Sequence, residues 1–200
     1  MVRSRILLEG GGESKETQIR CREAFRKLLE KCGYERRMPR LEACGGRQRA
    51  YRDFCLSHSQ ASEGQFVALL VDSEDPIPNI DAPWQHLKTR DNWDRPQGAV
   101  DEQVLLMTTC METWIAADPA SLQAHYGSCL QATALPPLTN MEERTRKSVY
   151  DALVHATRNC SEVYAKGANS FKVLSHIEPS AVRDHLPSFQ RLQRILDDSL

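Results

Sequence analysis

Two short acidic segments contain the residue types that could do chemistry. Residues 9–13 (EGGGE) follow the apolar run 5–8, and residues 72–75 (DSED) close the apolar run 66–71. Carboxylates at neighbouring strand ends repel one another unless a cation or a proton lies between them. Oxygen ligands select Mg²⁺ or Mn²⁺ rather than zinc. The two segments therefore predict a metal site formed by Glu9, Glu13, Asp72 and Glu74. The alternative, that these acids only cap turns and helices, fits either segment alone better than it fits both together.

The glycine run at residues 10–12 also invites comparison with loops that bind phosphate through backbone N–H groups. A phosphate loop needs Gly-Lys-Ser/Thr, but Lys15 lies between Ser14 and Glu16. The dinucleotide-binding fingerprint fails as well, because Lys15 occupies the position of its third glycine. These mismatches make the flanking acids the more informative residues.

Alternating strand and helix patterns surround the two acidic segments. Apolar residues recur at helical spacing in two stretches, and short apolar runs with turn residues at their ends lie between and after them. We expect helices at 16–32 and 48–58, and strands at 5–8, 38–44, 66–71 and 103–109. This order is typical of an α/β fold with a mostly parallel sheet flanked by helices.

The second half of the chain is different in character. Residues 75–100 contain four prolines and are predicted to form a long irregular loop beside the acidic strand end. A helix is expected over 141–155 with Asn140 as its cap, and further helices over the last 30 residues. We therefore expect an α/β core at 1–118 and a mostly helical part, 119–200, packed on it.

Composition sets limits on the kind of protein this is. The 200 residues have a net charge of −1, so no overall positive charge draws the chain to nucleic acid. No stretch approaches the ~18 apolar residues of a membrane span, and residues 1–5 do not resemble the start of a secretion signal. Seven cysteines form no Cys-x-x-Cys pair. We therefore expect buried reduced thiols and a cytoplasmic location.

Positive charge is concentrated locally on the first predicted helix. Its side chains form either an ordinary solvated face or a set of contacts to phosphates. The same two alternatives apply to Arg47 and Arg49, at the start of the second predicted helix. The residues of the first helix are Arg20, Arg22, Arg26, Lys27 and Lys31.

The order of these motifs resembles a known domain. Glu9-Gly-x-x-Glu13, then the Gly45-Gly46 pair, then Asp72-x-Glu74 is similar to the TOPRIM domain, in particular that of the OLD-type nucleases. Residues 111–118 (METWIAAD) and 164–166 (YAK) look like signatures of a bacterial TOPRIM-like family of unknown function. That family is commonly found beside ATPases in phage-defence operons. The chain departs from the pattern at Glu74, where TOPRIM domains usually have aspartate, and Asp75 could substitute there.

The resemblance implies roles for individual residues. Glu9 would be a metal ligand and the general acid or base, while Glu13, Asp72 and Glu74 would complete one or two Mg²⁺ or Mn²⁺ sites. Lys166 would supply a cation near the developing negative charge, with Lys172 as the second choice. The residues expected around the ligands are Glu112, Asp75, Gly45 and Gly46.

The resemblance therefore implies a metal-dependent nuclease, with Glu9, Asp72 and Lys166 as its catalytic residues. Its substrate would be DNA or RNA, and it would act as an effector of anti-phage defence with a separate ATPase as partner. The oligomeric state stays open, and no membrane is involved. Two alternatives remain: a catalytically silent TOPRIM-like subunit that regulates or binds a partner, and a phosphotransfer enzyme acting on small phosphoesters.

Overall fold

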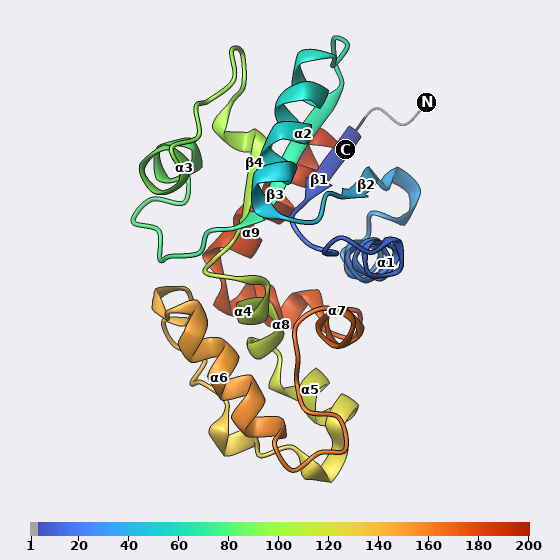
Figure 1. Cartoon of the computed structure of the whole chain (residues 1–200), viewed down its shortest axis with the longest axis vertical. Coiled ribbons are helices and arrows are strands. Elements are labelled where there is room, and N and C mark those ends of the chain that lie inside the picture. The colour runs from blue at the N-terminus through green and yellow to red at the C-terminus, as the bar shows by residue number, and fades with distance from the viewer. Residues whose placement is uncertain (1–3) are drawn as a thin grey trace.

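The computed structural model describes residues 4–200 and is built around one parallel sheet. Residues 1–3, part of the stretch in which no secretion signal is expected, lie outside the described residues. The strands follow the order β2-β1-β3-β4 and all their pairings are parallel (Figure 1). Their bounds are β1 Ser4–Leu8, β2 Arg40–Ala43, β3 Phe66–Asp72 and β4 Val104–Met107. The predicted α/β fold with a parallel sheet is confirmed.

Helices cover both faces of this sheet. Side chains alternate along β1, so Ile6 and Leu8 join one apolar cluster while Leu7 joins the other. The first cluster contains α1 (Lys15–Lys31), and the second contains α2 (Arg47–Ser59) and α3 (Pro83–Asp91). Strand β3 is buried on both faces, which explains its continuous apolar sequence.

The C-terminal helices share the core of the α/β part. Trp114, in α4 (Met111–Ala116), meets Phe25 of α1 and Phe189 of α9 (Pro187–Ser199) edge to face, at centroid distances of 6.3 and 4.9 Å. Arg191 of α9 donates to the backbone oxygen of Val104 in β4 at 2.7 Å. Residues on both sides of position 118 thus form one continuous apolar cluster.

The remaining α-helices, α5 to α8, lie in the lower half of the molecule in Figure 1. Across residues 4–200, none of the helices combines the length and the apolar character needed to cross a bilayer. The remaining α-helices are α5 Pro119–Tyr126, α6 Arg146–Thr157, α7 Ala168–Leu174 and α8 Pro179–His185. Single 3-10 turns occur at η1 Glu35–Arg37, η2 Asp101–Gln103, η3 Gly127–Cys129, η4 Ala132–Ala134 and η5 Met141–Glu143.

Two expectations about local structure are wrong. The stretch 75–100 is not wholly irregular, because α3 begins at Pro83. Proline is acceptable at the first position of a helix, where its missing N–H has no partner to lose. The helix expected over 141–155 begins at Arg146, and its cap is Thr145, whose Oγ1 accepts from the Ser148 N–H at 3.2 Å. Asn140 instead has a left-handed backbone before η5.

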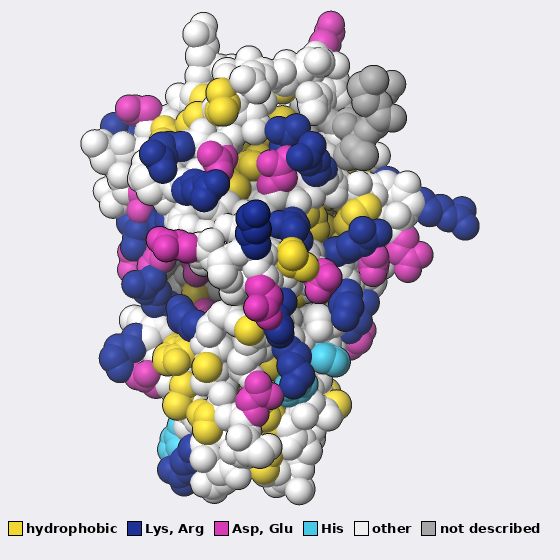
Figure 2. Space-filling view, turned by 45° about the vertical axis from the view of Figure 1, so that its right-hand side comes forward, with side chains coloured by type: hydrophobic (Ala, Val, Ile, Leu, Met, Phe, Trp, Pro, Cys, Tyr) yellow, Lys and Arg dark blue, Asp and Glu magenta, His cyan; other side chains and the backbone are white. Residues whose placement is uncertain are grey.

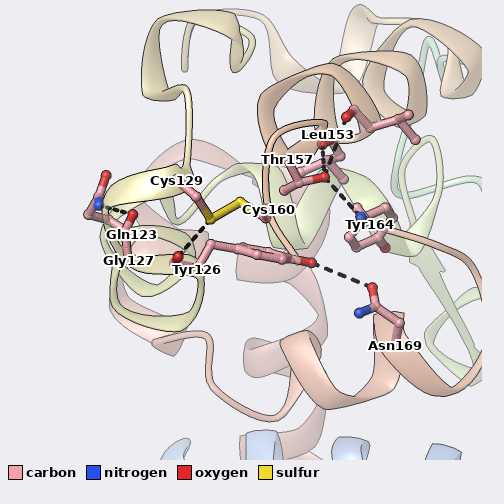
Figure 3. The surroundings of a disulfide bond; sticks show 10 residues. Gln123, Tyr126, Gly127, Cys129, Leu153, Thr157, Cys160, Tyr164 and Asn169 are labelled. Atoms are coloured by element: carbon pink, nitrogen blue, oxygen red, sulfur yellow. Dashed lines mark hydrogen bonds between the residues drawn. A yellow bond between two sulfur atoms is a disulfide. The ribbon is translucent and has the colours of Figure 1, made fainter. Parts of the chain in front are cut away.

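The expectation that all cysteines are reduced thiols is also wrong. Cys129 and Cys160, 31 positions apart, form a disulfide between the end of η3 and the segment after α6 (Figure 3). The same segment is held by the Tyr164 N–H, which donates to Thr157 Oγ1 at 2.8 Å. The sequence does not reveal this disulfide because the two cysteines are far apart and neither belongs to a short motif. The disulfide ties down the chain that leads to residues 164–166.

Replacing Trp114 by alanine tests whether both halves of the chain form one unit. We expect Trp114→Ala to lower the free energy of unfolding by about 3–5 kcal/mol, because it leaves a cavity between α1 and α9. The whole chain should still unfold in a single urea transition, followed by far-UV circular dichroism. Leu56 is 58% exposed, so Leu56→Ala should change the stability by no more than about 0.5 kcal/mol. Two separate transitions, only one of them shifted, would argue against the shared core.

Candidate metal centre

Three carboxylates meet at the carboxyl edge of the sheet. Oxygen atoms of Glu9, Asp72 and Glu74 all lie within 4.8 Å of one another. Strands β1 and β3 are parallel neighbours in which Leu8 pairs with Leu70. Both strands therefore end at the same edge, and the residues that follow must converge there. The structure brings together three of the four predicted metal ligands.

Glu9 is locked to the end of β3 by backbone hydrogen bonds. Its N–H donates to the Leu70 carbonyl at 2.9 Å, which extends the β1–β3 ladder by one residue. Its carboxylate Oε2 accepts from the Asp72 N–H at 3.2 Å. The Glu9 side chain is mostly buried, with 17% of it exposed. The position of Glu9 is thus set by the sheet and not by a flexible loop.

Asp72 connects the sheet to the helix that follows β4. It is the last residue of β3, and its Oδ1 accepts from the backbone N–H of Met111, the first residue of α4, at 2.9 Å. The adjacent residue, Glu112, is buried, and its charge acts on Asp72. Asp72 therefore lies where the β3 end, the β4–α4 turn and Glu9 meet.

Glu74 reaches the cluster through an unusual backbone conformation. Its φ is +70°, in the left-handed region, and its N–H donates to the Thr109 carbonyl at 2.8 Å. For a residue with a side chain such a conformation costs of order 1–3 kcal/mol, and such costs occur often at functional sites. The Glu74 side chain is only 9% exposed, and its Oε2 is buried and accepts no hydrogen bond of good geometry.

Arg47 balances the charge of Glu9. Its Nη1 lies 3.2 Å from Glu9 Oε2, while its Nη2 lies 2.6 Å from Asp91 Oδ2. Its guanidinium also rests 4.8 Å from the centre of the Trp93 ring. Because Arg47 is held on three sides, it fixes the Glu9 side chain in place.

Glu74 has two arginines of its own. Arg90 of α3 lies 3.3 Å from Glu74 Oε2, and Arg146 at the start of α6 contacts the same oxygen. The sequence suggests Arg47 either as a phosphate contact or as part of a solvated helix end, and it gives no sign of the other two. No local motif marks Arg90 or Arg146, because only the folding of the chain brings them to the acids.

Burial, together with the repulsion of neighbouring carboxylates, raises the pKa of two of the acids. The pKa of Asp72 is raised well above its ordinary value, first by burial and then by the charges of Glu9 and Glu112. The pKa of Glu9 is raised by burial as well, although Arg47 works in the opposite direction. A divalent cation is one way to stabilise both groups in their charged forms.

Glu112, Tyr164 and Lys166 form the wall beside Asp72. The Tyr164 hydroxyl donates to Glu112 Oε1 at 3.4 Å, and Lys166 Nζ lies 3.7 Å from Glu112 Oε2. The charge of Lys166 also works to lower the pKa of Asp72, against the larger effect of burial. The Lys166 side chain is 56% exposed, so its ammonium can move towards a ligand.

Three other predicted residues lie outside this group. Glu13 is exposed and does not belong to the cluster of mutually close acids. Asp75 is exposed and pairs with Arg90 at 3.1 Å. Lys172 lies in α7 and pairs with Glu162 at 3.1 Å. The glycine turn explains the position of Glu13, because it leads the chain away from the sheet edge into α1.

The glycine pair stabilises that turn. The N–H groups of Gly45 and Gly10 each donate to the other's carbonyl at 2.8 Å. Gly45 has a φ of +81°, and a Cβ there would lie 2.6 Å from the backbone oxygen of Gly12. Gly45 therefore permits the close approach of its backbone to Gly12, while Gly46 caps α2.

The arrangement fits a hard divalent cation. The donors are all carboxylate oxygens, they lie close enough to share an ion, and one of them, Glu74 Oε2, is buried with ion pairs but no hydrogen bond. No thiol contributes: burial raises the pKa of Cys21, Cys44 and Cys110 to about 12.

Asp72→Asn tests the electrostatic cost of the cluster. Below about pH 3.9 the carboxyl is protonated in both the folded and the unfolded chain. Between about pH 3.9 and the raised folded-state pKa, only the unfolded chain loses the proton, so the native protein loses stability as the pH rises. The asparagine variant has no proton to lose. In EDTA at pH 7.5 we expect Asp72→Asn to be more stable, by about 1.4 kcal/mol for each unit of raised pKa.

The measurement is the urea midpoint between pH 4 and pH 8, and the gain should shrink towards the acid end. The side-chain oxygen of the introduced asparagine can still accept from the Met111 N–H, so packing should change little. Asp198→Asn, at an exposed position in α9, is the matched control and should show no such trend. If the native protein is more stable than Asp72→Asn at pH 7.5 in EDTA, the ionised Asp72 carboxylate does not destabilise the fold and this account of the cluster is wrong.

Metal titration separates Glu9 from Glu13. Isothermal calorimetry with Mn²⁺ should show binding to the native protein, weakened at least about tenfold (~1.4 kcal/mol) in Glu9→Gln. Glu13→Gln should bind like the native protein because Glu13 lies outside the cluster. Equal losses in the two variants would place Glu13 back in the site.

One protein family matches almost the whole chain. None of the curated proteins and none of the solved structures matches it. Residues 8–197 match a family described as a domain of unknown function (DUF4276). That span contains all three acids of the cluster as well as Glu112 and Lys166. The chain therefore belongs to the DUF4276 family.

Proposed function

We propose that this protein is a Mg²⁺- or Mn²⁺-dependent nuclease that cleaves phosphodiester bonds of DNA or RNA. The observation that carries the proposal is the cluster of Glu9, Asp72 and Glu74 at the carboxyl edge of a parallel sheet. Ligands bind at this edge in open α/β sheets. The resemblance of the acidic motifs to those of TOPRIM nucleases agrees with the proposal.

The three carboxylates would hold the metal. A divalent ion there would polarise a phosphoryl oxygen and lower the pKa of a bound water. Glu9 has a raised pKa and a fixed position, which suit it to accept a proton from the attacking water. Arg47 keeps the Glu9 side chain from turning away.

Lys166 would act on the phosphate. Its ammonium lies 3.7 Å from Glu112 Oε2, its side chain is 56% exposed, and its charge acts on Asp72, so it would be free to turn towards a ligand there. A positive charge near the oxygens on which negative charge develops stabilises the transition state. Glu112 is held in turn by the Tyr164 hydroxyl, so the buried pair positions the lysine.

We further propose an effector of anti-phage defence that works with a separate ATPase. The sequence carries no phosphate loop of its own, since the glycine turn at 10–12 lacks the required Lys-Ser/Thr pair. The resemblance to a TOPRIM-like family found beside ATPases supports this partnership.

A second candidate is a catalytically silent subunit. The observation that favours it is the set of arginines paired with the acids, Arg47, Arg90 and Arg146. These cations can balance the cluster without a metal ion. In such a subunit the acidic edge would be a structural junction between α2, α3 and α6.

A cleavage assay decides between these functions. Native protein, Glu9→Ala and Asp72→Ala are incubated with DNA, RNA and a mononucleotide ester in Mg²⁺ and in Mn²⁺, with and without the ATPase. We expect the native protein to cut polynucleotide and both variants to lose at least about 10³-fold in rate. Lys166→Ala should lose about 10²–10³-fold, the effect of removing one stabilising group, and Lys166→Arg should recover part of it.

The controls make each outcome decisive. Glu13→Gln should cut within about twofold of the native rate, since a surface residue outside the cluster contributes little. Cleavage of the mononucleotide ester alone would make the protein a small-phosphoester enzyme. Equal rates in the native protein, Glu9→Ala and Asp72→Ala would refute the site.

A further inference from the structure

A groove with a positively charged lining runs between α1 and α7. Its volume is about 200 Å³. Its cationic side chains are Arg20 and Lys27 from α1 and Lys172 from α7, and His176 also lines it. Glu23 is the one carboxylate among the lining residues. The groove is therefore a local region of positive charge on a chain whose net charge is −1.

Two of the three cations, Arg20 and Lys27, are available to a ligand, whereas Lys172 is paired with Glu162 at 3.1 Å. Within residues 4–200, Lys27 has no carboxylate within 4 Å, and it is exposed. Arg20 is paired only with Glu16, one turn earlier on the same helix, and half of its side chain is exposed. Exposed pairs of this kind contribute little to stability, so an incoming phosphate can displace the carboxylate. Figure 2 shows Lys and Arg side chains spread over the side of the molecule on which α1 lies.

One wall of the groove lies beside the glycine turn that follows Glu9. Its wall residue Phe171 lies beside the glycine turn, because a Cβ at Gly10 would meet its ring at 3.5 Å. Helix α1 leads away from Glu9 through that turn, and α7 begins two residues after Lys166. Both walls of the groove thus start close to residues of the candidate centre.

Positive charge continues on the other side of α1. A second hollow of about 360 Å³ lies between α1 and the β2 edge, and its lining includes Arg22, Arg26 and Arg40. Arg22 has no carboxylate within 4 Å among residues 4–200. Helix α1, 17 residues and about 25 Å long, is therefore flanked by cations on both sides.

We infer that the α1–α7 groove binds the phosphodiester backbone of a single nucleic-acid strand and leads it to the acidic cluster. This inference rests on the proposed nuclease function and adds the path of the substrate. Lysine and arginine contacts to phosphate position a strand without reading its sequence. They also let a protein of nearly zero net charge bind a polyanion, because only the groove needs to be positive.

Binding in EDTA tests the groove without any cleavage. Fluorescence anisotropy is measured with short single-stranded DNA and RNA over a series of salt concentrations. We expect the double variant Arg20→Ala/Lys27→Ala to bind at least about tenfold more weakly. The slope of log K against log[salt] should become shallower by about 1.4, since each phosphate contact on a single strand contributes about 0.7. Tighter binding of one of the two nucleic acids to the native protein identifies that nucleic acid as the preferred ligand.

The matched control removes the same charge from the opposite face. Arg52→Ala/Lys88→Ala alters exposed side chains of α2 and α3, which cover the other side of the sheet. Its affinity should stay within about twofold of the native value, as expected for positions away from the ligand. A loss equal to that of the groove variant would mean that only net charge matters, and would overturn the inference.

The remaining outcomes separate the groove from the nuclease. Binding that depends on Arg20 and Lys27, combined with a native protein that cuts nothing, upholds the groove and rejects the nuclease. If the native protein cleaves nucleic acid, but the native protein, the groove variant and the control variant all bind the oligonucleotide equally well, the groove is rejected and the nuclease is not. A native protein that binds no oligonucleotide, or that binds polyglutamate as tightly and with the same dependence on both residues, also rejects it.

Discussion

Two parallel neighbours, β1 and β3, each lead directly into a carboxylate at the same edge of the sheet. The sheet places Glu9 and Asp72 side by side, and burial raises the pKa of both. The protein holds this unfavourable pair with hydrogen bonds to the charged groups, from the Asp72 N–H to Glu9 and from the Met111 N–H to Asp72. Such repulsion is tolerated because the core beneath it is large and continuous. Partly buried acids with raised pKa values are frequent in sites that bind metal or move protons.

Arginines from three of the surrounding helices balance that charge. Arg47, Arg90 and Arg146 come from α2, α3 and α6, so the acids connect the α/β part with the helical part. Glu112 adds a fourth carboxylate, and Lys166 stands beside it with an exposed ammonium. The Cys129–Cys160 disulfide anchors the segment that carries Tyr164 and Lys166. In the proposed function, the ion pairs between these basic side chains and the acids stabilise the metal-free protein. When a metal ion binds to the acids and a phosphate enters, the basic side chains become free to contact the phosphate.

The sheet and the central acids could be predicted from sequence because their signals are local. The apolar run of β3 and its closing Asp72 are visible in a few consecutive residues, and parallel strands oblige Glu9 to lie nearby. The motif alone also predicts Glu13 as a ligand, but the glycine turn carries that residue into solvent. Arg90, Arg146 and the disulfide could not be found this way, since each depends on residues far apart in the chain. The start of α6 is a further case, because Thr145 and not Asn140 caps the helix.

If Glu9, Asp72 and Glu74 form a cation site, arginines balance their charge only until the metal arrives. Anomalous diffraction from crystals grown with Mn²⁺ can locate the ion among these side chains. We expect an anomalous peak at a position where the ion is coordinated by all three carboxylates, and we expect the Arg146 guanidinium to have moved away from Glu74. A structure at saturating Mn²⁺ with the three arginines still paired and no peak between the acids would rule the cation site out.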